Sequence, residues 1–187
     1  MAIYTKIENQ DIYYLFQKFG GIEKMRGIAE GVENTNYLIN TNNKKKYIFT
    51  IFEKRTKGSD LPFFHKAMNE FRFKGINCPT PILVNEKDIF SIKGKSCAIY
   101  SFVNGSQITS LNEQAIISLS MTVSKIHHIG IKSKLYREND MLQPSWKYIL
   151  DKFKDYKGKN ENELNHIANV ISILENKFPK NLRKALV

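Results

Sequence analysis

Residues 27–39, GIAEGVENTNYLI, say more about the architecture than any other part of the chain. Glycines and small polar residues here lie between apolar segments, which is typical of a loop between two antiparallel strands. Glycine lets the backbone come close to a phosphate, and the backbone N–H groups can then bind its oxygens. The stretch matches neither the GxGxxG fingerprint nor a Walker A loop, and an ordinary hairpin with asparagine at its turn would look similar. A phosphate-facing loop and a plain hairpin both stay open on these residues alone.

The segments around this stretch predict a helix and a five-stranded antiparallel sheet. Residues 11–19 carry apolar side chains at helical spacing and end at two glycines. Residues 60–74 predict a second helix, which is inserted between the third and fourth strands and cannot continue through Pro79 and Pro81. The apolar segments that we interpret as strands are 26–29, 37–39, 47–52, 82–84, 90–92 and 97–103.

The remainder of the chain is predicted to be helical. Amphipathic spacing indicates helices over 112–129, 145–156 and 161–178. We place a boundary near residues 104–110, which divides the chain into a part with the sheet, 1–104, and a helical part, 105–187. An antiparallel sheet with one inserted helix, followed by helices, is the layout of an α+β protein-kinase-like fold. Fold order alone does not establish function.

The charge of the chain does not by itself indicate a nucleic-acid partner. The formal net charge is +11, but the lysines are spread along the chain. The one tight run, Lys44 to Lys46, follows Asn42 and Asn43 and is interpreted as the solvated tip of a hairpin. We therefore expect attraction of a nucleotide or another anion rather than binding of nucleic acid.

Targeting and cysteine patterns indicate an ordinary intracellular protein. No stretch approaches the roughly 20 apolar residues of a membrane span. The first ten residues lack the basic and then apolar order of a signal peptide. We therefore expect a cytoplasmic protein with no membrane partner. Cys78 and Cys97 have no CxxC spacing and no paired histidines nearby, so reduced structural thiols are expected.

Five blocks of sequence resemble, in order and separation, the bacterial homoserine kinases of the aminoglycoside-phosphotransferase type. The blocks are GIAEGVENTNYLI (27–39), YIFTIFEKR (47–55), DLPFF (60–64), CPTPI (78–82) and AIYSFVNG (98–105). The resemblance spans the whole chain and is looser in the helices. It implies that residues 1–104 are a nucleotide-binding N-lobe and residues 105–187 an incomplete helical C-lobe. It implies transfer of a phosphoryl group from ATP to the side-chain hydroxyl of L-homoserine, which gives O-phospho-L-homoserine on the way to threonine. It also implies Mg²⁺ as the ion that bridges the phosphates.

The resemblance also assigns site residues. The phosphate-facing loop would contain Gly31, Val32, Glu33, Asn34, Thr35 and Asn36. Ser101, Phe102 and Val103 would form the hinge whose backbone meets adenine. Phe49, Ile51 and Ile99 would wall the base pocket, although core packing is the preferred interpretation for any one of them. Thr50 stands where kinase-like folds usually have a lysine for the phosphates, so the cation is open between Lys54, Arg55 and none.

The residues that perform the chemistry in this family are missing from the sequence. The family pattern is His-x-Asp-x-x-x-x-Asn, followed later by a second aspartate for the metal. The residues two places after the four histidines are Ala67, Ile129, Gly130 and Ala168, and none is an aspartate. We therefore assign no catalytic residue and no metal ligand.

Three interpretations follow from this absence. The first is a homoserine-kinase-like protein truncated before the catalytic loop and inactive alone, such as the product of a pseudogene, with weak nucleotide affinity. The second is a split kinase, in which a separate chain supplies the C-terminal half. The third is a noncatalytic module that binds a nucleotide, RNA or another protein. We expect the first.

Overall fold

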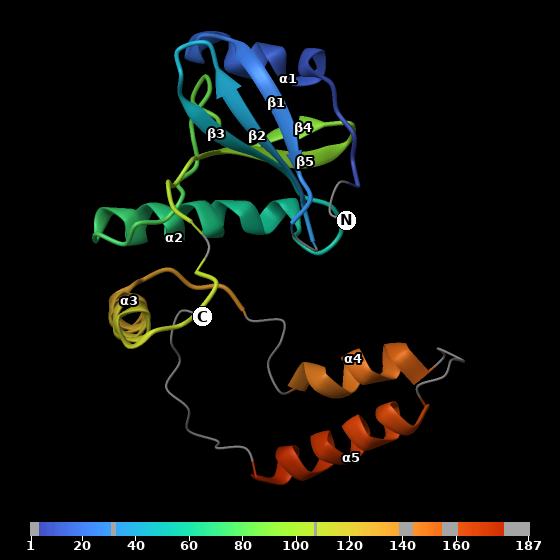
Figure 1. Cartoon of the computed structure of the whole chain (residues 1–187). Helices are drawn as coiled ribbons and strands as arrows, with labels where there is room; N and C mark the ends of the chain where they lie inside the picture. The colour runs from blue at the N-terminus through green and yellow to red at the C-terminus, as the bar shows by residue number, and fades with distance from the viewer. Residues whose placement is uncertain (1–3, 31–32, 107, 139–143, 155–160, 178–187) are drawn as a thin grey trace. The chain divides into compact units, whose positions relative to one another are not determined.

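The computed structural model describes residues 4–30, 33–106, 108–138, 144–154 and 161–177. The chain forms two compact units, residues 1–135 and 136–187 (Figure 1). The proposed division of roles at residue 104 stays a prediction. Within the described residues, no helix is both long and apolar enough to cross a membrane.

The first unit is built on one antiparallel sheet of five strands in the order β1-β2-β3-β5-β4. The strands are β1 (Ile22–Ile28), β2 (Thr35–Thr41), β3 (Lys46–Ile51), β4 (Phe90–Ile92) and β5 (Lys95–Ser101). Helix α2 (Leu61–Phe73) lies between β3 and β4 in the chain. The predicted α+β kinase-like order is therefore confirmed for this unit.

One face of the sheet carries the core. Side chains alternate between the two faces of a strand, so the odd-numbered residues of β2, β3 and β5 share one face. These residues pack against α1 (Asn9–Phe16), which contributes Ile12, Leu15 and Phe16 to the same buried cluster. A capping box between Glu8 and Asp11 begins α1. Figure 1 shows α1 on one side of the sheet and α2 on the other.

Two details differ from the predicted elements. Strand β1 begins at Ile22 rather than Arg26, with a register shift between Ile22 and Lys24. Residues 82–84 form only isolated bridges, Pro81 with Tyr100 and Val84 with Lys87. Pro81 has no N–H to donate to a ladder. Residues 85 and 86, directly after Val84, have positive φ angles of 51° and 64°, so no regular strand continues there.

Three further helices follow the sheet. Helix α3 (Glu113–Lys132) belongs to the first unit and begins at Asn112, whose side chain accepts a hydrogen bond from the backbone N–H of Ala115. The second unit contains α4 (Pro144–Lys154) and α5 (Glu161–Lys177), which an ion pair between Lys147 and Glu175 at 2.6 Å connects. All three predicted helices are present, with ends shifted by a few residues.

Both cysteines are free thiols, as expected from their spacing. Cys97 is fully buried in the core, and burial raises the pKa of its thiol to about 12. A thiol with so high a pKa is a weak nucleophile and a poor metal ligand, which fits a packing role.

Candidate nucleotide-binding site

The second face of the sheet, opposite α1, carries the even-numbered residues of β1, β2, β3 and β5. Strand pairing places Ile28, Asn36, Thr50 and Ala98 in one row across the strands. The next row toward the hinge contains Arg26, Leu38, Ile48 and Tyr100. The first row adjoins the predicted phosphate-facing loop, and the second lies nearer the predicted hinge. This face therefore presents polar groups at its loop end and apolar groups behind them.

Thr50 does not point a free hydroxyl at the loop. Its Oγ1 donates to the Asn36 side-chain carbonyl at 2.8 Å, and the Asn36 Nδ2 donates to the backbone carbonyl of Asn34 at 3.4 Å. Thr50 is 7% exposed. The threonine at the usual lysine position is thus the base of a short chain of hydrogen bonds that orients Asn36 and the loop.

Thr35 faces the core rather than the second face. It is fully buried, and its Oγ1 accepts hydrogen bonds from the backbone N–H groups of Tyr4 and Thr5 at 3.0 and 3.1 Å. The same hydroxyl donates to Glu53 Oε1 at 2.6 Å. Because its hydrogen-bonding capacity is used, Thr35 anchors the end of the loop. Gly31 and Val32, the glycine and its neighbour in the predicted loop, lie outside the described residues.

Glu53 is the centre of this anchor, and sequence reasoning did not single it out. Its side chain is 6% exposed and forms an ion pair with Lys95, whose Nζ also donates to the Thr5 hydroxyl at 2.8 Å. Burial acts to raise the pKa of Glu53, but the hydrogen bonds from Lys95, Thr35 and Thr5 outweigh burial and hold it below its ordinary value. The carboxylate therefore stays ionised and connects the loop, the end of β3 and the start of β5.

We expect the Glu53 network to make stability depend on acid. A carboxyl whose pKa is lowered by folding contributes stability that is fully present above its unfolded pKa, about 4.3, and is lost as the pH falls through its folded pKa. Urea midpoints should fall on acidification below about pH 5. Glu53→Gln should be less stable at pH 7 and lose part of that acid dependence. Glu23→Gln, which removes an exposed ion pair with Lys44, is the matched control and should retain it.

The two cations after β3 differ in their surroundings. Lys54 is exposed, and no described residue pairs with it. Arg55 forms an ion pair with Glu33 of the predicted loop, and both side chains are largely exposed. Exposed pairs of this kind contribute about 0–1 kcal/mol, so this contact is easily exchanged for a ligand. The place of Lys54 at a nucleotide stays a prediction.

The predicted hinge follows the end of β5. The Ser101 hydroxyl accepts a hydrogen bond from the backbone N–H of Thr80 at 2.9 Å, and the Ser101 N–H donates to the Thr80 carbonyl at 2.9 Å. These two hydrogen bonds hold Ser101 against Thr80. Within the described residues, no backbone hydrogen bond outside the sheet ladders involves Phe102 or Val103, and Val103 lies beyond the last β3–β5 pair, so its backbone groups are available to a base.

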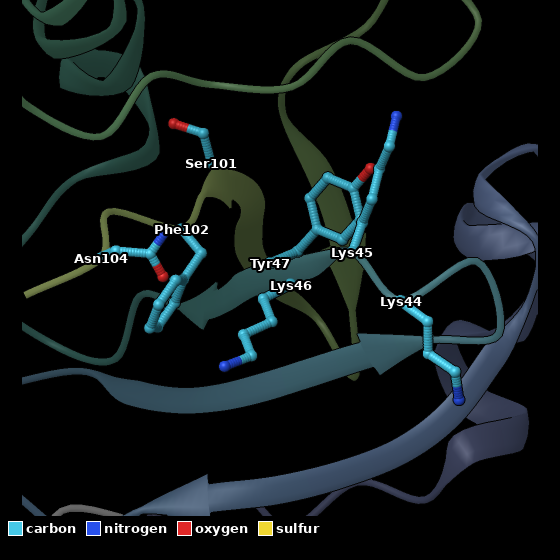
Figure 2. Close-up of a pocket in the computed structure, with 7 residues that line it drawn as sticks. All are labelled: Lys44, Lys45, Lys46, Tyr47, Ser101, Phe102 and Asn104. Atoms are coloured by element: carbon cyan, nitrogen blue, oxygen red, sulfur yellow. The ribbon is translucent and has the colours of Figure 1, made fainter.

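A shallow cavity of about 360 Å³ lies where the hinge meets the β2–β3 hairpin. Its lining residues are Lys44, Lys45, Lys46, Tyr47, Ser101, Phe102 and Asn104 (Figure 2). Figure 2 shows the three ammonium groups pointing apart, and Lys46 Nζ lies 5.4 Å from the centre of the Phe102 ring. The lysines do not converge on one point, so the cavity offers no single anion site.

The structure shows core packing, the preferred interpretation, for the three residues that the resemblance would place in the wall of the base pocket. Phe49, Ile51 and Ile99 are fully buried and belong to the core cluster on the α1 face. The apolar residues that face the other way are Ile28, Leu38 and Ile48, which are partly exposed. The alternation of side chains along a strand could have identified them. Ile48 lies two positions from Thr50 on the same strand, and strand pairing places Ile28 and Leu38 on the same face of the sheet.

The described residues hold no group of three or more histidine, cysteine or acidic side chains that could bind a metal ion. The sequence also lacks the family pattern of catalytic aspartate and metal-binding asparagine. The residues present therefore do not fit a Mg²⁺ site. What the geometry offers is a surface for a base and phosphates.

Two relatives of similar sequence are both homoserine kinases. The chain is 31% identical over 158 residues to the homoserine kinase of Parvibaculum lavamentivorans, an alignment that covers 83% of this chain and 49% of that enzyme. It is 29% identical over 191 residues to the homoserine kinase of Rhizobium etli, covering 100% of this chain and 59% of the enzyme. The chain thus spans about half the length of the relatives it matches.

Solved structures share the fold at low sequence identity. A spectinomycin phosphotransferase in complex with ADP and spectinomycin has a TM-score of 0.66 at 14% identity, covering 95% of this chain and 60% of its own. An amicoumacin kinase in complex with AMP-PNP and Ca²⁺ has a TM-score of 0.68 at 16% identity, with 92% and 54% covered. The model of the phosphotransferase enzyme family matches residues 24–187. With sheet order, relatives and family match in agreement, this chain belongs to the phosphotransferase enzyme family.

Proposed function

We propose that this chain is the nucleotide-binding part of a homoserine-kinase-like phosphotransferase. The family reaction transfers the γ-phosphoryl group of ATP to the side-chain hydroxyl of L-homoserine. The observation that carries the proposal is the arrangement of the second face, where the Thr50–Asn36–Asn34 chain lies at the loop end and open hinge backbone groups lie at the other. The homoserine kinases of similar sequence support the choice of acceptor.

The two ends of the site would bind different parts of ATP. The base would lie against Ile28, Leu38 and Ile48 and meet the backbone of Phe102 and Val103. The loop from Gly31 to Asn36 would face the phosphates, and Arg55 or Lys54 would supply positive charge beside it. Mg²⁺ would bridge the phosphates in the family reaction, but its ligands are not among the residues of this chain. We therefore infer weak nucleotide binding without catalysis by this chain alone.

A second candidate function is one half of a two-chain kinase. Helix α3 leaves apolar side chains uncovered by the rest of the first unit: Ile116, Ile117, Leu119, Met121 and Val123 are 40–69% exposed. A run of exposed apolar residues marks a surface that is covered in a complete fold. A complementing chain would supply both this cover and the missing aspartates. Its absence would leave the first proposal, a protein that binds nucleotide and turns nothing over.

The proposal is tested by titrating the chain with ATP, ADP and adenosine in a calorimeter. We expect ATP to bind in the high-micromolar to millimolar range. Thr50→Val keeps the shape of the side chain but frees Asn36, and loss of one hydrogen bond should weaken ATP about two- to tenfold. Adenosine should be unaffected, because its base lies at the hinge.

Thr122→Val is the control for this titration, because the Thr122 hydroxyl bonds only to the Ser118 carbonyl within α3. It should bind ATP like the unaltered chain. Absence of any nucleotide binding by the unaltered chain would refute the proposed function. Tight binding of an RNA that falls steeply with salt would favour a nucleic-acid module instead.

A further inference from the structure

Three hydrogen-bonded side chains, two of them buried and the third, Asp88, partly exposed, connect α2 with the last part of β5. His65 of α2 is 2% exposed, and both of its ring nitrogens have partners. Nδ1 lies 2.8 Å from Asp88 Oδ2, and Nε2 lies 2.8 Å from the Tyr100 hydroxyl. The imidazole and phenol rings meet edge to face, with centroids 5.5 Å apart and an interplanar angle of 85°. No part of the proposed reaction uses this group.

Either ring nitrogen of a histidine can donate or accept, and for a neutral His65 ring the direction of each hydrogen bond follows from its partner. An ionised carboxylate only accepts, so Nδ1 of His65 carries the proton that it donates to Asp88. In the neutral ring Nε2 is then an acceptor, and the Tyr100 hydroxyl donates to it. Burial, with a smaller effect of the Asp88 charge, raises the pKa of Tyr100, so the phenol keeps its proton. Each polar atom between the rings is satisfied.

The position of Tyr100 connects these hydrogen bonds to the hinge. Tyr100 lies directly before the hinge residues 101–103, opposite Ile48 of the second face. On its other side β5 is held by the bridge from Pro81 and by the hydrogen bond from Ile82 N to the Ile99 carbonyl at 2.8 Å. His65 is therefore the contact through which α2 reaches the strand that carries the hinge.

We propose that His65 is a positioning residue, which holds the Tyr100 side chain and so fixes the hinge backbone of Phe102 and Val103 where a nucleotide base meets it. This inference rests on the proposed function, since only a hinge that binds a base gives the contact this role. Tyr100 is not a nucleophile, because it is 8% exposed and its hydroxyl proton is engaged. Asp88 sets the tautomer that makes Nε2 an acceptor.

Two substitutions of His65 separate its two hydrogen bonds. In His65→Gln the longer side chain carries an amide oxygen to the place of Nε2, where it can accept from Tyr100. In His65→Asn the shorter side chain reaches only the place of Nδ1, where its amide can donate to Asp88. Both variants lose one buried hydrogen bond and should lose similar stability. Tyr100→Phe removes the same contact as His65→Asn from the other side.

The test is hydrogen–deuterium exchange of residues 98–101, the hydrogen-bonded end of β5 that leads into the hinge, whose protection is called hinge protection below. Residues 47–51 are the internal reference, and the affinities for adenosine and ATP are measured on the same variants. We expect His65→Asn and Tyr100→Phe to lower hinge protection about fivefold or more, the equivalent of one lost hydrogen bond. The affinities for adenosine and ATP should fall by the same factor, because both ligands use the hinge. His65→Gln should stay close to the unaltered chain in each measurement.

Equal behaviour of His65→Gln and His65→Asn, or a hinge protection that no variant changes, would overturn the inference and leave His65 a packing residue. If the unaltered chain binds no nucleotide, the proposed function fails, while the exchange measurement still decides whether His65 fixes the hinge. If His65→Asn does not fold, Tyr100→Phe decides alone, because it keeps the ring and removes one oxygen.

Discussion

Incubated with ATP, Mg²⁺ and L-homoserine, the purified 187-residue chain is expected to form O-phospho-L-homoserine at least about 10⁴-fold more slowly than the ~1–100 s⁻¹ typical of kinases. The physical reason is that the sequence lacks the family's His-x-Asp pattern, whose aspartate orients and deprotonates the acceptor hydroxyl. General-base catalysis alone contributes roughly 10²–10⁴ in rate. The metal that neutralises the triphosphate has no ligands in the described residues either, so its contribution is lost as well.

The measurement is a coupled assay for ADP together with direct detection of the phosphorylated product. The Rhizobium etli homoserine kinase, which aligns with the whole of this chain, is the positive control. The same enzyme shortened to the aligned residues is the matched negative control, because it keeps only the part that aligns with this chain. Product formation by this chain at ordinary kinase rates would contradict the expectation and would require a base and metal ligands outside the family pattern.

A second arm of that experiment separates the two candidate functions. The remaining part of the Rhizobium etli enzyme, added as a separate chain, should restore no turnover if the protein is a noncatalytic nucleotide binder. Restored turnover would instead support the two-chain kinase. In that case, detergent-sensitive association should map to the apolar surface of α3, and Leu119→Glu should abolish it. Leu119 is 56% exposed, so this change leaves the fold of the first unit intact.

Much of the fold was predictable because its signals are local. The glycines at 20 and 21 ended the first helix as expected, and both have positive φ angles, 90° and 76°. The order of strands along the chain was also predicted from the apolar segments, and the extent of the inserted helix from Pro79 and Pro81. The segment at 82–84 was predicted as a strand because its three residues are apolar, but it forms only isolated bridges. Pro79 and Pro81 lack the N–H that a ladder needs, and residues 85 and 86 have positive φ angles.

The site was less predictable because it depends on register and on contacts far apart in the chain. Thr35 and Asn36 are neighbours in sequence, yet one is buried in the core and the other faces Thr50. The partners of His65 are 23 and 35 positions away, so no local pattern could identify them. Glu53 likewise has no local signal, because its partners Thr35 and Lys95 lie 18 and 42 positions away in the chain.

Neighbouring residues of β3 face opposite sides of the sheet, so substitutions at Phe49 and Ile48 should have different effects on stability and on nucleotide binding. Phe49 is fully buried among the α1 face of the core, and Phe49→Ala should cost about 3–5 kcal/mol of unfolding free energy through lost burial and the cavity left behind. Domains of this size have a stability of only about 5–15 kcal/mol. The urea midpoint should therefore fall by a large fraction of its value, and any loss of nucleotide binding should follow the unfolded population.

Ile48→Ala is the matched comparison, because Ile48 is the adjacent residue, is partly exposed and faces the second face. It should cost less than half as much stability as Phe49→Ala and leave the chain folded at low denaturant. Nucleotide affinity should nevertheless fall, equally for adenosine and ATP, because the base loses an apolar contact. If Phe49→Ala proved the milder of the two in unfolding, or if Ile48→Ala left adenosine affinity unchanged, then the assignment of these two faces would be wrong. The alternation of strand side chains, and with it the placement of the base, would have to be reversed.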